Sequence, residues 1–190
     1  MILQHIRSHT ADLHKSLEMK LSAKLFTPDL KPSVYYDLLK AFCSAYRALE
    51  RAAGNVPMIA NLLVERSKIS LLEQDLQHIK NRLETVNDDF PASTLPKTDS
   101  EALSLGMMYV MEGATLGGKQ IVNYLERFAW IELENSLNFF NSYGDDRGKM
   151  WKEFIEVLEK YAESNPSERD TIVKGAYQAF SHIDKAITRV

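Results

Sequence analysis

The chain of 190 residues contains a single cysteine, Cys43. One cysteine excludes an internal disulfide framework and a metal site built from several thiolates. This usage is typical of proteins in a reducing compartment, so we expect a cytoplasmic location. Cys43 lies on an apolar helix face with no histidine near it in the sequence, which favours a small core residue over a nucleophile.

Long apolar runs and an excess of basic charge are also absent. No segment reaches the ~20 apolar residues of a membrane-spanning helix, and His5, Arg7 and His9 interrupt the apolar positions near residue 1. The chain has 23 basic and 26 acidic residues, which gives a net charge of −3. This balance cannot offset many phosphates, so we expect neither a membrane protein nor a nucleic-acid-binding protein.

Glycine and proline are scarce, at 8 and 6 residues, and they separate long segments with helical spacing of apolar residues. The segments predict helices over residues 3–25, 32–54, 69–86, 98–128, 146–163 and 167–189, with a short piece after Pro57. Residues 87–97, which include Pro91 and Pro96, predict a loop. Short connections and the lack of repeats predict an all-α fold, with one helical-bundle domain over residues 1–190.

Capping boxes mark two of the expected helix starts. The first is Ser70-x-x-Glu73, and the second is Thr98-x-x-Glu101. In such a box the leading hydroxyl and the following carboxylate satisfy backbone N–H groups that have no partner inside the helix. We therefore expect helices to begin at Ser70 and Thr98.

The first helix carries a histidine on its apolar side. At about 100° per residue, His14 falls inside the arc of leucines, whereas His5 and His9 project to the polar side. Glu18 follows His14 by one turn, and Thr10 precedes it by one turn. A carboxylate at that place can accept one ring N–H, which fixes the tautomer and leaves the other nitrogen for iron. The alternative is a histidine at the edge of the core that Glu18 satisfies.

The helix expected over residues 98–128 has glycines in its interior, each of which costs about 1 kcal/mol relative to alanine. Gly106, Gly113 and Gly117 project onto one face, and Gly117-Gly118 allows a bend. A bare face lets another object approach the helix backbone closely. That object is either a flat ligand or another helix, and a helix C-cap at Gly117 is a further alternative.

The two helices together are more informative than either alone. The first offers an inward histidine, His14, with the basic Arg7 on the same side. The second offers a nearly side-chain-free stretch around Gly113 and Gly117. These are the two walls of a slot for a planar metal macrocycle that needs one axial nitrogen ligand and room for a small ligand opposite.

At these residues the chain resembles the haem oxygenase family, most closely the bacterial type associated with phytochromes. The matching motifs are RSHTADLHKSLE at residues 7–18 and YVMEGATLGG at residues 109–118. Weaker matches are Phe139-Phe140 with nearby aromatic residues, and AYQAF at residues 176–180. In this order the resemblance covers nearly the whole chain.

The resemblance implies roles for particular residues. His14 is then the proximal ligand of the haem iron, with Glu18 as its partner, and Gly113 and Gly117 lie over the haem. Arg7 matches a basic position that pairs with a haem propionate. The other residues expected around the haem are Thr10, Tyr109, Gly118, Phe139, Phe140 and Phe180.

The chain departs from the family pattern in three places, the first of which is Met108, where many members carry a tyrosine five residues before the first distal glycine. Many members carry an aspartate directly after the first distal glycine, and this chain has Ala114 there. Either Thr115, which we expect to be catalytic, or backbone groups with water would then organise the proton supply. A second basic partner for a propionate aligns near Glu156, and Lys152 or Lys149 is the nearest basic candidate.

The resemblance implies a reaction in which haem is both cofactor and substrate. Haem, dioxygen and electrons give biliverdin, carbon monoxide and ferrous iron. The Gly117-Gly118 pair follows a helix rather than a strand, so it is no dinucleotide-binding fingerprint. We therefore expect an external electron donor, a reductase or a ferredoxin. A photoreceptor that accepts the bilin is the further partner implied.

Three alternatives compete with this interpretation. A di-iron protein needs paired Glu-x-x-His motifs, and the chain offers only Asp75-x-x-His78. A thiaminase-type enzyme would use Cys43 as a nucleophile. A carrier would bind haem or a bilin without turning it over, and Ala114 is an argument for it.

Overall fold

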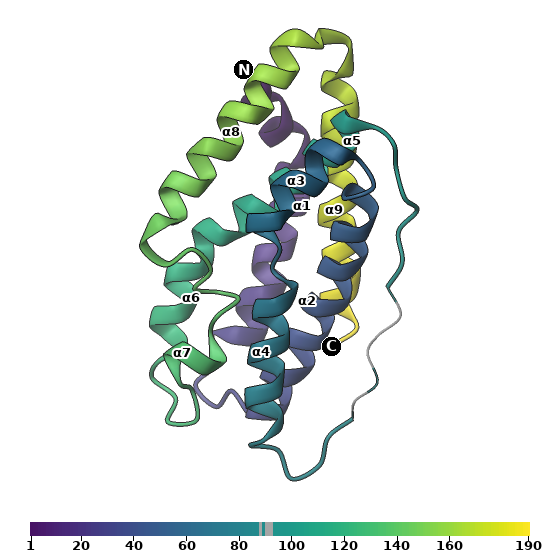
Figure 1. Ribbon diagram of the computed structural model, residues 1–190. Coiled ribbons are helices and arrows are strands. Elements are labelled where there is room, and N and C mark those ends of the chain that lie inside the picture. The colour runs from purple at the N-terminus through teal and green to yellow at the C-terminus, as the bar shows by residue number, and fades with distance from the viewer. Residues whose placement is uncertain (88, 90–92) are drawn as a thin grey trace.

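The computed structural model describes residues 1–87, 89 and 93–190; residues 88 and 90–92, including Pro91 of the expected loop, lie outside the described residues. Every regular element in the described part is a helix, so the all-α prediction is confirmed (Figure 1). The elements are α1 (Ile2–Leu25), α2 (Pro32–Ala53), α3 (Pro57–Arg66), α4 (Ile69–Lys80), α5 (Glu101–Gly113), η1 (Ala114–Gly117), α6 (Gly118–Leu125), α7 (Leu133–Ser136), η2 (Gly144–Asp146), α8 (Arg147–Ser164), η3 (Pro166–Glu168) and α9 (Arg169–Thr188). Among these described helices, none combines the length and apolar content needed to cross a bilayer.

Proline and serine determine where three of the helices begin. Pro32 and Pro57 open α2 and α3 at the first helical position, where the missing N–H is not needed. Ser100 is the N-cap of α5, and its Oγ accepts a hydrogen bond from the Leu103 N–H at 3.1 Å. The serine satisfies a free N–H group of the first turn of its helix, and each proline avoids such a group because it has no N–H.

The two predicted capping boxes are wrong. Thr98 lies two residues before the actual N-cap of α5, and its Oγ1 accepts from the N–H of Ser100. Ser70 lies inside α4, because that helix begins one residue earlier, with Lys68 as its N-cap. In both cases the motif is present but its register along the helix differs by one or two residues, which is the usual uncertainty of helix ends.

Two expected helices are shorter than predicted. The segment 98–128 is interrupted after Gly113 by the 3₁₀ turn η1, and α6 begins at Gly118. The tighter i→i+3 hydrogen bonds of this turn change the direction of the backbone at the glycine-rich stretch. The helix expected over 69–86 ends at Lys80, because the N–H groups of Arg82 and Leu83 bond three residues back, to Ile79 and Lys80.

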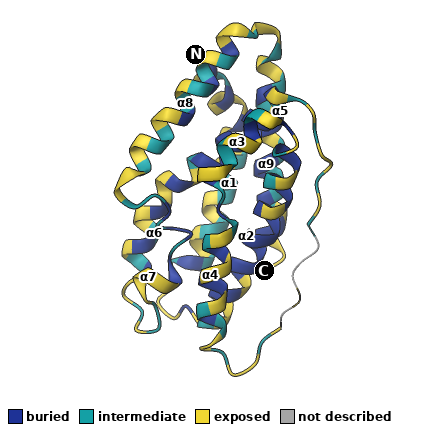
Figure 2. Ribbon diagram, viewed as in Figure 1, coloured by how far each residue is buried: buried dark blue, intermediate teal, exposed yellow. Residues whose placement is uncertain are grey.

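Helices α5 and α9 pack against each other through two glycines. A Cβ on Gly106 would overlap the carbonyl oxygen of Ile172 in α9, and one on Gly175 would overlap that of Leu103 in α5. The two backbones are therefore closer than any side chain permits. Helices α2 and α5 are buried along most of their length, whereas α8 exposes much of its surface (Figure 2). Gly106 serves this helix contact, so its grouping with the ligand-facing glycines is wrong.

The close contact gives a first prediction. We expect Gly106→Ala to lower the free energy of unfolding by about 1–3 kcal/mol, because the methyl group must push the two helices apart. Urea unfolding followed by circular dichroism measures this change. Gly148→Ala is the matched control, since nothing lies within 4 Å of the added carbon, and it should be neutral or stabilising by up to about 1 kcal/mol. A Gly106→Ala protein as stable as the wild type would contradict the packing.

Candidate functional site

A cavity of about 750 Å³ lies between α1 and the segment formed by α5, η1 and α6. Its volume falls in the range of small-molecule and cofactor pockets. Helix α9, the segment 139–142, part of α2, Lys68 and Trp151 complete its wall. The sequence-predicted residues that line it are Arg7, Thr10, His14, Glu18, Tyr109, Gly113, Thr115, Gly117, Gly118, Phe139, Phe140 and Phe180.

The apolar stripe of α1 is buried only at the two ends of the helix. Ile6 and Leu25 are fully buried, whereas Leu17 and Leu21 are half-buried. Leu17 and Leu21 pack against the core and also line the cavity, so the rest of their apolar surface faces the cavity. Apolar surface left open in this way is typical of a ligand-binding wall.

His14 faces the cavity from the middle of α1. Its Nδ1 lies 3.5 Å from Oε2 of Glu18, one turn later, and its ring packs edge-on against Phe180 with centroids 5.6 Å apart. The imidazole is 57% exposed. With Nδ1 turned toward a carboxylate, Nε2 is the ring nitrogen that can act as a ligand.

The opposite wall is nearly free of side chains. Nothing lies within 4 Å of a Cβ built on Gly117, and a Cβ on Gly113 would touch only the Trp151 ring, at 3.5 Å. A ligand can therefore approach the backbone at Gly117, whereas at Gly113 the Trp151 ring already lies on the side where a Cβ would point. Gly118 has another role, because a Cβ there would overlap the carbonyl oxygen of Phe140. Gly118 thus allows the segment 139–142 to pack against the start of α6.

The hydroxyl groups of the two threonines expected in the site both donate to backbone carbonyl oxygens. Thr115 donates its O–H to the carbonyl oxygen of Glu112 at 2.7 Å, and Thr10 donates to that of Ile6 at 2.9 Å. Both bonds run back along the helix, as is common for threonine. The hydroxyl of Thr115 therefore offers the cavity acceptor lone pairs rather than a free donor.

The basic candidates are not equivalent. Arg7 lines the cavity from an exposed position on α1. Lys152 is 80% exposed on α8, where its Nζ lies 3.9 Å from Glu156, and it is not among the residues that line the cavity. Lys149 does not line it either. The structure therefore brings Arg7 to the site and leaves both lysines outside it.

Asp75 fixes the aromatic part of the wall. Its Oδ1 accepts hydrogen bonds from the backbone and side-chain N–H groups of Asn138, both at 2.8 Å, and its Oδ2 accepts from the N–H of Phe139 at 2.9 Å. These bonds hold Phe139, whose ring packs against Tyr46 and Phe42. Burial raises the pKa of this carboxyl to about 6, against the opposing effect of the hydrogen bonds.

The raised pKa of Asp75 predicts a pH dependence of stability. The folded state holds this proton up to a pH of about 6, whereas the unfolded chain loses it near the ordinary value of about 3.9. The contribution of Asp75 is therefore fully present at low pH and is lost as the pH rises through about 6. We expect the difference in unfolding free energy between wild type and Asp75→Asn to fall between about pH 4 and 6 and then level off. Urea titrations across that range test this, and a difference that rises with pH would contradict it.

A buried ionic cluster, which the sequence interpretation missed, lies directly behind the glycine wall. Glu112, 1% exposed, binds Arg66 Nη1 through Oε2 at 2.6 Å and Lys68 Nζ through Oε1 at 3.2 Å. The hydroxyl of Tyr143 donates to the same carboxylate, at 2.9 and 3.1 Å. We call Arg66, Lys68, Glu112 and Tyr143 the Glu112 cluster. The sequence carries a signal for this cluster, because Glu112 is the only charged residue in the apolar segment 102–113. An isolated charge in such a segment is buried only when it is paired.

Burial perturbs the titration of two members of the Glu112 cluster. It lowers the pKa of Lys68, with the nearby Glu112 acting in the opposite direction. It raises the pKa of the Tyr143 phenol, and the charge of Glu112 adds to that rise. Lys68 is 2% exposed and lines the cavity. The cluster therefore brings a desolvated ammonium group next to the ligand space.

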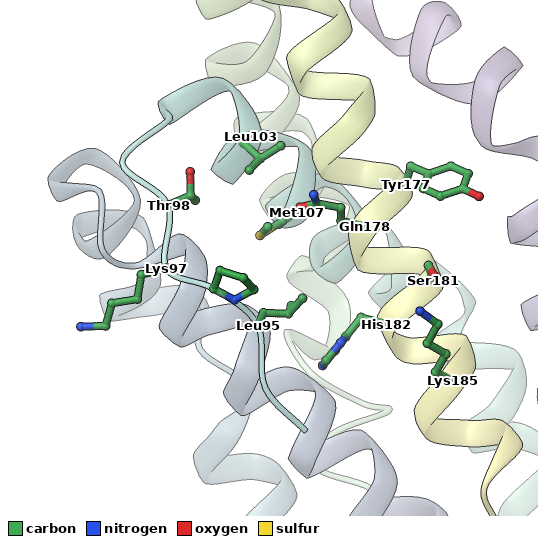
Figure 3. A pocket seen from close by; sticks show the side chains of 11 residues that line it. Leu95, Lys97, Thr98, Leu103, Met107, Tyr177, Gln178, Ser181, His182 and Lys185 are labelled. Carbon is green, nitrogen blue, oxygen red and sulfur yellow. The ribbon is translucent and has the colours of Figure 1, made fainter. Parts of the chain in front are cut away.

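A second, smaller cavity of about 340 Å³ lies on the other side of α9. Figure 3 shows it between the segment 95–98 and α9, with Leu103 and Met107 of α5 beside it. His182 bonds Ser93 Oγ at 2.7 Å, and Lys97 points away from the cavity in Figure 3. It contains none of the site residues predicted from the sequence.

The residues that would serve the alternative enzymes are used for structure. Cys43 is fully buried, and burial raises the pKa of its thiol, which disfavours the thiolate that a nucleophile needs. The carboxylate oxygens of Asp75 accept hydrogen bonds from the backbone N–H groups of Asn138 and Phe139. His78 lies 3.6 Å from Glu132 at the surface. Within the described residues, no group of three or more His, Cys, Asp or Glu side chains could hold a metal ion.

The fold and the cavity together define a class of protein. It is an α-helical ligand-binding protein in which one imidazole faces a bare helix backbone across a single slot. The sequence matches the family model described as "Heme oxygenase" over residues 1–188. The chain therefore belongs to the heme oxygenase family, which confirms the family predicted from residues 7–18 and 109–118.

Relatives agree with this assignment. A curated heme oxygenase from Xanthomonas campestris pv. campestris (strain 8004) is 31% identical over 117 residues, which is 62% of this chain and 65% of that protein. The NO- and CO-bound heme oxygenase from Neisseria meningitidis has a TM-score of 0.75 at 18% identity, covering 100% of this chain and 91% of the other. Heme oxygenase 2 from Chlamydomonas reinhardtii without heme has a TM-score of 0.77 at 16% identity, covering 98% and 96%. At these identities the two structures support the fold alone.

Proposed function

We propose that this protein is an active haem oxygenase, which cleaves haem to biliverdin and releases carbon monoxide and ferrous iron. It uses dioxygen and electrons from an external donor. One observation carries this proposal: His14, held by Glu18, faces the bare backbone at Gly117 across a cavity of about 750 Å³. Family membership over residues 1–188 supports the same activity.

The residues present fit a haem. The cavity has the size of a cofactor pocket, and its wall combines aromatic and aliphatic side chains with few polar groups. Phe139, Phe140 and Phe180 supply the flat apolar surfaces that a porphyrin needs. The open space at Gly117 leaves room on the side opposite the histidine.

Each polar residue of the site has a distinct task in this proposal. Nε2 of His14 would bind the haem iron, and the carboxylate of Glu18, 3.5 Å from Nδ1, would favour the tautomer that leaves Nε2 free. The guanidinium of Arg7, at the open side of the cavity, pairs with a propionate. The backbone at Gly113 and Gly117 confines the space for a small ligand, and Trp151 packs behind it. Bound haem supplies the oxidising chemistry, while these residues bind and orient it.

The partners follow from the chemistry that the chain does not supply. Electrons come from a separate reductase or ferredoxin. We further propose that the protein is of the phytochrome-associated type and passes its biliverdin to a photoreceptor, as the motifs at residues 7–18 and 109–118 suggest. Its location in the cytoplasm is supported by the single, buried Cys43.

A haem or bilin carrier is the second candidate function. Two observations favour it: Ala114 has no polar group, and the Thr115 hydroxyl donates to the backbone of Glu112. Both remove a side-chain donor from the glycine wall. A carrier would bind haem in the same cavity without converting it.

Titration of the purified protein with hemin, followed by addition of ascorbate or a reductase in air, separates the two functions. An oxygenase develops a Soret band at one haem per chain and then converts it to bilin absorbance with release of carbon monoxide. A carrier keeps the Soret band unchanged. The proposal fails if haem does not bind, or if it binds and persists under reducing conditions with dioxygen present.

A further inference from the structure

The glycine wall offers a cavity ligand few side-chain hydrogen-bond donors. Ala114 carries none, and Thr115 donates its hydroxyl to the carbonyl of Glu112. A small ligand that accepts hydrogen bonds therefore needs a donor from a neighbouring segment. Lys68, in the turn between α3 and α4, and Ser142 are polar residues of the cavity wall that come from such segments.

Lys68 is fixed by three acceptors. Its Nζ donates to the carbonyl oxygen of Arg66 at 2.5 Å, to the hydroxyl of Tyr143 at 2.7 Å, and to Oε1 of Glu112 at 3.2 Å. The bond to Glu112 is the longest of the three. At 2% exposure the ammonium group is almost fully desolvated, so each of its hydrogen bonds is stronger than it would be in water.

The bond from Lys68 to Glu112 can be redirected without leaving a buried carboxylate unpaired. Glu112 Oε2 keeps Arg66 Nη1 at 2.6 Å, and the Tyr143 hydroxyl reaches both carboxylate oxygens, at 2.9 and 3.1 Å. Glu112 thus retains one cation and one neutral donor when an N–H of Lys68 turns to another acceptor. The cluster can hold Lys68 in place while one of its protons serves the cavity.

The hydroxyl of Ser142 is a second polar group at this place. Ser142 precedes Tyr143, lines the cavity and is 4% exposed. Its Oγ is buried and has no hydrogen-bond partner among the described residues. Buried hydroxyl groups are normally satisfied, so Ser142 brings an unsatisfied hydroxyl group to the cavity wall that Lys68 also lines.

We propose that Lys68 is a positioning residue that donates a charge-assisted hydrogen bond to the small ligand sharing the cavity with haem. Tyr143 and Glu112 hold its ammonium group at the wall behind Gly113, where the ligand space adjoins the Glu112 cluster. The role takes the place of the side-chain donor that Ala114 and Thr115 do not provide. This inference rests on the proposed function, because it needs haem in the cavity.

Ligand binding to the haem complex tests the inference without turnover. Fluoride on ferric haem accepts hydrogen bonds strongly, whereas carbon monoxide on ferrous haem accepts them weakly. We expect Lys68→Met to raise the dissociation constant of fluoride about tenfold or more, with the carbon monoxide affinity unchanged. Lys160→Met, at an exposed lysine of α8, is the matched control and should change neither.

A second variant separates donation by Lys68 from integrity of the cluster. Tyr143→Phe removes one of the groups that hold the ammonium group but keeps Lys68, so it should weaken fluoride binding much less than Lys68→Met does. The inference is overturned if Lys68→Met binds fluoride normally, if it weakens fluoride and carbon monoxide equally, or if Tyr143→Phe loses as much fluoride affinity as Lys68→Met. Failure of the proposed function is a different result, because the wild type would then bind no haem or would keep its bound haem unconverted with a reductant and dioxygen.

Discussion

Replacing His14 with alanine is expected to remove the imidazole-type Soret band of the haem complex and to abolish conversion of haem to biliverdin. The reason is that Nε2 of His14 is the imidazole nitrogen that the structure presents to the cavity, with Nδ1 turned to Glu18 at 3.5 Å. Without this ligand, haem can still enter the apolar slot. In the proposed site, the iron would then lack the imidazole nitrogen that would hold it.

The fold should survive this substitution. The imidazole of His14 is 57% exposed, and its main packing contact is the edge of Phe180. We therefore expect the free energy of unfolding to change by only about 0.5 kcal/mol, as for other surface positions. Absorption spectra of the hemin complex and a bilin assay measure the functional loss, and urea unfolding measures stability on the same sample.

Two controls make the result specific. His9→Ala removes an exposed histidine of the same helix that bonds the carbonyl of His5 and does not line the cavity, so its spectrum and turnover should match the wild type. Added imidazole should restore a nitrogen-ligated spectrum to His14→Ala by filling the space of the lost ring. A variant at position 14 that keeps the wild-type band and activity would show that another residue ligates the iron.

Most residues that line the candidate site could be predicted, because each of its two walls has its own sequence pattern. A histidine within an arc of leucines, followed by a carboxylate one turn later, identified His14 and Glu18. Helix-interior glycine identified Gly113 and Gly117. The same criterion failed at Gly106, because a glycine that admits a ligand and one that admits a neighbouring helix look alike until the position of Ile172 is known. Spacing along one helix carries no information about what lies opposite.

The isolated charge of Glu112 indicates a buried, paired carboxylate, but neither its partners nor the contacts of Asp75 could be predicted from the sequence. Lys68 lies in a short turn where a lysine is ordinarily solvated. Its burial depends on contacts with Glu50 of α2, Glu112 of α5 and Tyr143, which precedes η2. The sequence allowed a bend at Gly117-Gly118, but it did not predict the 3₁₀ turn at residues 114–117 that interrupts the helix there. The apolar pattern continues through residues 118–128, and a local pattern cannot distinguish a bend from an uninterrupted helix.

Neutralising Glu112 is expected to be the most destabilising of these substitutions. Glu112→Gln keeps the size of the side chain but leaves Arg66 and Lys68, which are 7% and 2% exposed, without their shared counter-charge. Glu153 lies 3.7 Å from Arg66 but is half exposed, so it compensates little. Breaking a buried ion pair on one side costs about 3–5 kcal/mol, which is a large part of the 5–15 kcal/mol that stabilises a typical domain.

An exposed pair on the same protein provides the matched comparison. Glu73 binds Arg47 at 2.5 Å, but the two side chains are 52% and 46% exposed. Glu73→Gln should therefore cost about 1 kcal/mol or less, and high salt should reduce that difference further. Urea unfolding of both variants at low and high salt measures the contrast. Equal losses would mean that water reaches the Glu112 cluster, and the desolvated ammonium group on which the role of Lys68 depends would then not exist.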